Sequence, residues 1–130
     1  MDNARHIAEF LRDHPKVASI LYLGFLPEGS AARAVYDHQC KAAGSTFSFA
    51  VVGGEAEAFR FLDRLTLLRF AVSLGGSETL ITHPATTTHY ALTPAERAAG
   101  GITDATLRLS VGIEHVEDLL ADLAQALDAV

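Results

Sequence analysis

The chain has 130 residues, of which 49% are hydrophobic and 20% are charged, a composition typical of one folded domain that buries a core without disulfide or metal. Its formal net charge is −6 and lysine and arginine form no cluster, which argues against a nucleic-acid partner. The N-terminus has no apolar leader and the sequence has no run of 18 apolar residues, so we predict a cytoplasmic protein with no membrane segment. Cys40 is the only cysteine, so no intrachain disulfide can form. Cys40 is predicted to be a small buried residue.

Helices and strands alternate in the first half of the chain. The predicted elements are helices over 3–14, 31–43 and 55–65 and strands over 17–23 and 45–52. His14-Pro15 ends the first helix, because the residue before a proline avoids helical backbone angles. Ser30 is the predicted N-cap of the second helix, with Gly44 at its C′ position.

Shorter elements are predicted in the second half. They are strands over 70–74, 79–83 and 107–113, a short helix over 94–99 and a final amphipathic helix over 116–130. The run Thr93-Pro94-Ala95-Glu96 has the form of a capping box with proline at the first helical position. We therefore predict one α+β domain over residues 1–130, with a mostly antiparallel sheet and helices packed over one face. The other face needs a cover.

The run "RLSVGI" over 108–113 has two different sides. Alternation places Leu107, Leu109, Val111 and Ile113 on one side of a strand and Arg108, Ser110 and Gly112 on the other. The second side is small around a single cation. It is either a solvent face or the floor of a pocket from which a guanidinium reaches an anion.

Several kinds of chemistry lack their sequence signals. There is no dinucleotide fingerprint and no Walker A loop, and His83 and His89 have no zinc-ligand spacing, so we predict no metal site and structural or surface roles for both histidines. Ser73, Ser77 and Ser110 have no G-x-S-x-G elbow and no evident base, which argues against a nucleophilic serine.

A series of motifs resembles one enzyme family. In order they are S-L-G-G, H-P-A-x-x-T-H, P-x-E-R, G-I and R-L-S-V-G-I-E, all within 71–127. This half resembles the C-terminal domain of the pyridoxal-phosphate enzymes of cysteine and methionine metabolism, the group that contains cystathionine γ-synthase, cystathionine γ-lyase and methionine γ-lyase. The first half also resembles the segment that leads into that domain in the family, with "IAEFLRDHPKVASILYLGF" over 7–25, then a strand rich in Ser and Phe, a Gly-Gly pair and a helix. The resemblance implies the small C-terminal domain of fold-type I pyridoxal-phosphate enzymes.

The resemblance also implies roles for particular residues. Arg108 falls on the family arginine that pairs with the substrate's α-carboxylate, and Ser73 is similar to the residue beside the cofactor-linked lysine. Val72 looks like a pocket wall, where cystathionine-handling members tend to carry glutamate, so the chain looks more like methionine γ-lyase and its sulfhydrylase-like relatives. Thr87 and Thr88 are expected to help hold Arg108 in position without contacting the substrate themselves.

The lysine that holds the cofactor is the main missing part. Lys16 and Lys41 are the only lysines, and neither lies in the family's cofactor motif, so we expect no catalytic residue in this chain. Pyridoxal phosphate is expected to bind in a longer protein, together with a large cofactor domain and in a homo-oligomer, for which the family implies a tetramer. That enzyme would carry out β- or γ-elimination or γ-replacement on methionine, cystathionine or an O-acylhomoserine, and this chain alone would be inactive. The alternative is a free-standing, non-catalytic binding or assembly module derived from such an enzyme, which would bury its open sheet face by self-association.

Overall fold

A five-stranded sheet with the order β1-β2-β5-β4-β3 forms the centre of the computed structural model, which describes all 130 residues. The strands are β1 (Val17–Leu21), β2 (Thr46–Val51), β3 (Arg69–Phe70), β4 (Leu80–Thr82) and β5 (Thr106–Ser110). All neighbouring strands are antiparallel except β3 and β4, which run parallel. The expected mostly antiparallel sheet is therefore confirmed, with one parallel pair at its edge.

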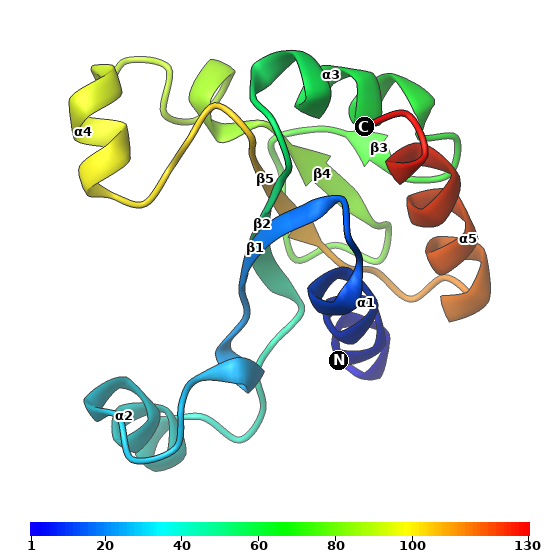
Figure 1. The fold of residues 1–130 in the computed structure, drawn as a ribbon. Helices are drawn as coiled ribbons and strands as arrows, with labels where there is room; N and C mark the ends of the chain where they lie inside the picture. Colours follow the sequence, from blue (N-terminus) through cyan, green and yellow to red (C-terminus); the bar gives the residue numbers. More distant parts are fainter.

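Three of the five helices cover one face of this sheet. The five helices are α1 (Asp2–Asp13), α2 (Ala31–Gln39), α3 (Glu55–Arg64), α4 (Pro94–Ala99) and α5 (Val116–Leu127), with single 3₁₀ turns η1 (Leu23–Phe25) and η2 (Pro84–Thr86). Helices α1, α3 and α5 lie together on one side of the strands, whereas α2 and α4 stand away from the sheet at its two ends (Figure 1). The opposite face of the sheet therefore has no helical cover.

The core lies between the sheet and these three helices. Along β5, Leu107 and Leu109 face the helices and are fully buried, and Phe47 and Phe49 do the same on β2. The ring of Phe49 meets Phe61 of α3 edge to face, with 5.9 Å between the ring centroids. Burying each such side chain contributes about 1.5–3 kcal/mol, so the alternation in β2 and β5 determines which face of the sheet points inward.

Helix α2 is shorter than the sequence predicts. It begins after Ser30, whose Oγ accepts a hydrogen bond from the N–H of Arg33 (3.1 Å), as expected for an N-cap. It ends at Gln39, because Cys40 has an extended backbone (φ −112°, ψ 136°), and Gly44 is not its C′ residue. No residue of α2 is buried, so no tertiary packing stabilises further turns.

The predicted burial of Cys40 is wrong. Cys40 is an exposed free cysteine, because it follows α2, which packs no residue into the core. The predicted strand over 107–113 ends earlier: β5 stops at Ser110, so Ile113 no longer follows its alternation and is 83% exposed. The predicted strand over 70–74 is also reduced to the two residues of β3. The capping box at Thr93 and Glu96 is confirmed, with Thr93 N donating to Glu96 Oε2 at 2.8 Å.

Candidate functional site around Arg108

Arg108 lies on the central strand β5 and on the uncovered face of the sheet. Its neighbours across the sheet are Ser48 on β2 and Thr82 on β4. Both are small, so the long arginine side chain meets no large side chain from the adjacent strands. The alternation of β5 places Arg108 opposite the core residues Leu107 and Leu109. The polar side of "RLSVGI" is therefore the open face of the sheet.

The guanidinium of Arg108 binds the backbone at Val72 and Ser73. Its Nη2 donates to the carbonyl oxygen of Val72 at 2.6 Å and to that of Ser73 at 3.4 Å. The structure thus brings together the three residues to which the sequence pointed. Their contact uses carbonyl groups, while the side chain of Val72 is 56% exposed and that of Ser73 is exposed.

Part of the guanidinium has no partner. Nε of Arg108 is buried and makes no hydrogen bond, and Nη1 also makes none. Arg108 forms no ion pair, unlike Arg5, Arg12, Arg33 and Arg60, each of which contacts a carboxylate. A guanidinium that contacts only carbonyl dipoles keeps its full positive charge and free N–H donors. This is the chemistry that binds a carboxylate or another planar anion.

A segment that we call the strap, residues 71–76, crosses the open face over β4 and β5. Besides the contact with Arg108, its Ala71 carbonyl accepts from Thr82 Oγ1, and its Gly75 N–H donates to Ser110 Oγ at 2.8 Å. The polar side chains of β4 and β5 therefore hold the strap down. Ser110 has this role in the structure, with its hydroxyl accepting the Gly75 N–H.

Gly112 is required by a close approach of the backbone. A Cβ atom built on it would lie 2.6 Å from Oε2 of Glu114 and 2.6 Å from the carbonyl carbon of Glu78. The adjacent Ile113 N–H donates to Ser77 O at 2.9 Å. The chain after the strap thus packs directly on the chain that leaves β5, and only a residue without a side chain fits between them.

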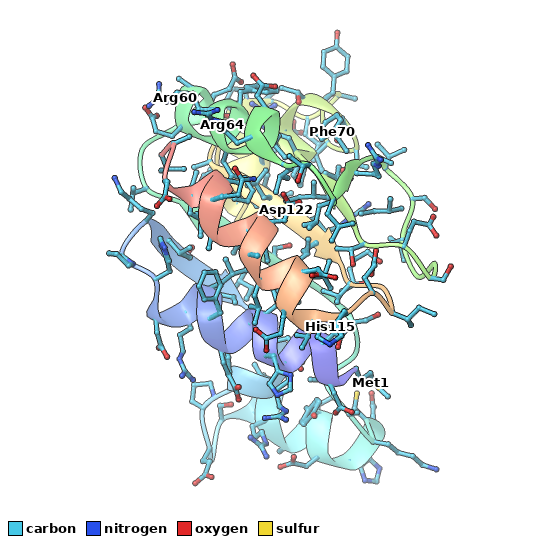
Figure 2. The ribbon with its side chains drawn as sticks, turned by 90° about the vertical axis from the view of Figure 1, so that its right-hand side faces the viewer. Met1, Arg60, Arg64, Phe70, His115 and Asp122 are labelled. Carbon is cyan, nitrogen blue, oxygen red and sulfur yellow. The ribbon has the colours of Figure 1, made fainter.

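Asp122 of α5 fixes the other end of the same segment and was not singled out from the sequence. Its carboxylate accepts hydrogen bonds from Thr66 N, Thr66 Oγ1, Leu67 N and Leu68 N at 2.8–2.9 Å. It lies on the side of α5 next to α3 and the β3 edge (Figure 2). Burial raises the pKa of Asp122, but these donors outweigh it and hold the pKa below its ordinary value. An acidic residue inside the apolar stripe of a helix was the available signal.

Thr87 and Thr88 bond within their own loop. Thr87 Oγ1 donates to the carbonyl of His83 at 2.7 Å, and Thr88 Oγ1 contacts Nδ1 of His89 at 2.8 Å. Neither hydroxyl hydrogen-bonds Arg108, so their expected support of Arg108 stays a prediction. His83 is fully buried, and its ring contacts Thr86 Oγ1 and the Asp104 carbonyl, both at 2.8 Å. It has a structural role, as the sequence predicted.

Neither lysine of this chain hydrogen-bonds Arg108 or the strap. The Nζ of Lys16 donates to the carbonyl of Val130 at 2.6 Å, where α1 and β1 meet the end of the chain, and Lys41 is exposed beyond α2. The Gly75 N–H of the glycine pair is already taken by Ser110. No group of three or more His, Cys, Asp or Glu residues is placed to hold a metal ion. No helix combines the length and the apolar character needed to cross a membrane.

Fold and site together define a class of domain, an α+β layer that presents an arginine without a counter-ion on an otherwise uncovered sheet face. The Cys/Met metabolism PLP-dependent enzyme family matches residues 1–128. The chain belongs to this family, as the motifs of the sequence suggested. The expected fold class, the small domain of fold-type I pyridoxal-phosphate enzymes, is confirmed with it.

Individual relatives cover nearly all of this chain. An L-methionine gamma-lyase of Fusobacterium nucleatum subsp. polymorphum is 44% identical over 128 residues, which are 98% of this chain and 32% of that enzyme. The crystal structure of cystathionine gamma synthase from Xanthomonas oryzae pv. oryzae with cystathionine is 44% identical, with a TM-score of 0.88 over 98% of this chain and 33% of that one.

A third relative carries the cofactor on a lysine. It is a Campylobacter jejuni protein assigned as an O-acetylhomoserine (thiol)-lyase, whose structure contains N′-pyridoxyl-lysine-5′-monophosphate. It is 36% identical, with a TM-score of 0.89 over 98% of this chain and 30% of that one. The chain therefore spans about a third of the length of these relatives.

Proposed function

We propose that this chain is the substrate-binding part of a pyridoxal-phosphate-dependent enzyme that acts on a sulfur-containing amino acid, and that Arg108 binds the α-carboxylate of that substrate. The observation that carries the proposal is the guanidinium of Arg108, which has a buried, unpartnered Nε and no carboxylate partner. The substrate's own carboxylate would supply the missing negative charge.

In the proposed mechanism this chain binds and orients the substrate. A carboxylate at the guanidinium accepts two N–H bonds in one plane, which fixes the direction of the bonds at Cα. Val72 and Ser73 hold the guanidinium from the other side through their carbonyls, so that it is already aimed before the substrate arrives. The cofactor, held by a lysine outside this chain, supplies the electron sink for β- or γ-elimination or γ-replacement. The exposed Val72 side chain borders the place where the substrate's side chain would lie.

The rest of the longer protein would cover the open face of the sheet. Leu21 on the edge strand β1 is 69% exposed, and Leu74 on the strap is 54% exposed. Exposed apolar side chains on the edge strand β1 and on the strap suit contact with a second domain or subunit. A large cofactor domain from the remaining two-thirds of the enzyme, assembled as a homo-oligomer, meets this requirement. The chain by itself would have no activity.

The test exchanges a segment between relatives. This chain replaces the matching 128 residues of the Fusobacterium enzyme, and the chimera is assayed with methionine, cystathionine and O-acetylhomoserine. Changing Arg108 to Lys removes the planar fork and should raise KM by about 10-fold or more, because hydrogen bonds to charged groups contribute about 1.5–3 kcal/mol. The absorbance of the lysine-bound cofactor should be unchanged. Arg69→Lys, an exposed arginine on β3 whose side chain makes no hydrogen bond, is the matched control. Equal KM values for both variants would refute the role of Arg108.

The alternative, a non-catalytic assembly module, is favoured by the same exposed apolar side chains. A module of that kind would bury them by self-association. Sedimentation velocity of the 130-residue chain distinguishes the two. A stable dimer or larger species at micromolar concentration supports the module, and a monomer at high concentration contradicts it.

A further inference from the structure

The carboxylate of Glu114, in the connection between β5 and α5, binds a single residue of the segment that follows the strap. Its Oε1 accepts from Thr79 N at 2.5 Å, and its Oε2 accepts from Thr79 Oγ1 at 2.7 Å. Thr79 is buried, and its hydroxyl in turn accepts from the N–H of Gly112 at 2.9 Å. Glu114 forms no ion pair, so its negative charge is held by these dipoles.

The same two segments are linked again beside this contact. Ile113 N donates to Ser77 O at 2.9 Å, and Gly112 leaves no room for a Cβ against the backbone at Glu78. We call residues 77–79 and 112–114 together the clasp. Both views show the loop before β4 lying beside the chain that enters α5 (Figures 1 and 2).

An ionised carboxylate accepts from both groups of Thr79 at once. A neutral amide would keep one acceptor for the Thr79 N–H and turn its NH₂ group toward the Thr79 hydroxyl, which would then have to accept instead of donate. Burial raises the pKa of Glu114, but the hydrogen bonds from the Thr79 hydroxyl and N–H outweigh it and leave the pKa below its ordinary value. The clasp is therefore strongest at neutral pH, and protonation removes the charge and one of its two acceptors.

The clasp limits where the strap can lie. Three residues, 74–76, separate Ser73 from Ser77, so the two Cα atoms can be at most about 14 Å apart. Residues 72–78 are all exposed and two of them are glycines, so the strap has little packing of its own. Its position depends on its two ends and on the hydrogen bonds from Arg108 and to Ser110.

We propose that Glu114 is a positioning residue of the Arg108 site, whose carboxylate, through Thr79, fixes the strap so that the Val72 and Ser73 carbonyls hold the guanidinium. This inference rests on the proposed function of Arg108 for its purpose in an enzyme. It does not depend on that function for its geometry, which lies wholly within this chain.

The test measures hydrogen exchange by NMR on the 130-residue chain without ligand. The probes are the amide protons of Gly75, Thr79 and Gly112 and the Nε–H of Arg108. Glu114→Ala, which removes both acceptors, should speed exchange at all four by about 10-fold or more, while amides of Leu107 and Leu109 keep their protection. Thr79→Ser keeps both donors and should retain slow exchange. Glu117→Ala, at an exposed glutamate in the first turn of α5, is the matched control and should change nothing.

Titration of the unchanged chain gives a second readout that needs no variant to fold. Glu114 has a lowered pKa, so the clasp should be intact above the ordinary glutamate pKa of about 4.3 and should open as pH falls through the lower value. After correction for intrinsic exchange, Arg108 Nε–H should lose protection over that range together with Thr79. If Thr79 opens and Arg108 stays protected, the clasp is only local and the proposal is wrong. Failure of Arg108 to bind carboxylates would leave these exchange results unchanged, so the two proposals fail separately.

Discussion

Replacing Asp122 with asparagine should destabilise the chain strongly, although it only exchanges one carboxylate oxygen for an NH₂ group. Oδ1 of Asp122 accepts from Thr66 N, Thr66 Oγ1 and Gln125 Nε2, and Oδ2 accepts from Leu67 N and Leu68 N. Asparagine has one acceptor oxygen, so its NH₂ group must face either Thr66 N and Gln125 Nε2 or Leu67 N and Leu68 N, and among these partners only the Thr66 hydroxyl can turn to accept from it. At least two hydrogen bonds to a charged group are lost, and the N–H of the buried Leu68 is among those at risk.

The expected cost follows from those two bonds. Hydrogen bonds to charged groups contribute about 1.5–3 kcal/mol each, so the free energy of unfolding should fall by about 3 kcal/mol. This is a large part of the 5–15 kcal/mol typical of a domain, and it corresponds to a decrease in Tm of roughly 10 °C for a chain of this length.

Urea and thermal unfolding followed by circular dichroism would measure this loss. Asp63→Asn is the matched control, since Asp63 is exposed on α3 and its carboxylate makes no hydrogen bond. The lowered pKa of Asp122 adds a pH signature: its contribution is full above the ordinary aspartate pKa of about 3.9 and disappears as pH falls through the lower folded-state value. Asp122→Asn should therefore flatten the acid limb of the stability profile. Similar losses in both variants, or an unchanged acid limb, would show that Asp122 does not anchor the segment.

Two other predictions concern single residues. Gly112→Ala should lower the free energy of unfolding by about 1–3 kcal/mol, because its Cβ would lie 2.6 Å from Glu114 Oε2 and from the Glu78 carbonyl carbon. Urea unfolding measures this loss. Gly29→Ala separates the steric cause from the conformational one, because Gly29 has a positive φ but no atom within 4 Å of an added Cβ. Cys40 should react with a disulfide reagent in the folded chain at nearly the rate of a free thiol, because it is exposed; reaction only after denaturation would contradict this.

Sequence periodicity predicted the elements that make their own local or core contacts. The alternation of Phe47 and Phe49 and the capping box at Thr93 both determine structure through neighbours in sequence or through one buried face. The end of α2 and the exposure of Cys40 were predicted wrongly. A helix without buried residues has no tertiary contact that selects its last turn, so a glycine farther along the chain was a misleading stop signal.

The sequence predicted which residues form the candidate site but not the contacts that join them. Motifs led to Arg108, Val72 and Ser73, but the carbonyl contacts between them depend on a segment that returns across the sheet 35 and 36 residues away in sequence. Periodicity carries no information on such a return. The roles of Asp122 and Glu114 were missed for the same reason. Asp122 was visible only as an acidic residue inside an apolar stripe and Glu114 only as the last residue of a motif, and the donors that define their roles lie 35 to 56 residues away.

These two carboxylates explain why the strap can be exposed and still have a defined position. Asp122 fixes residues 66–68 before it, and Glu114 fixes Thr79 after it, each through several donors to one ionised group. Between these anchors the chain needs no core packing, which leaves Val72 and Ser73 free on the open face of the sheet. Under the proposed role of Arg108 this surface receives a ligand, so it cannot also be filled by its own side chains. Anchoring a glycine-containing segment at its ends, and placing beneath its middle the guanidinium of Arg108, whose Nε has no partner, satisfies both conditions.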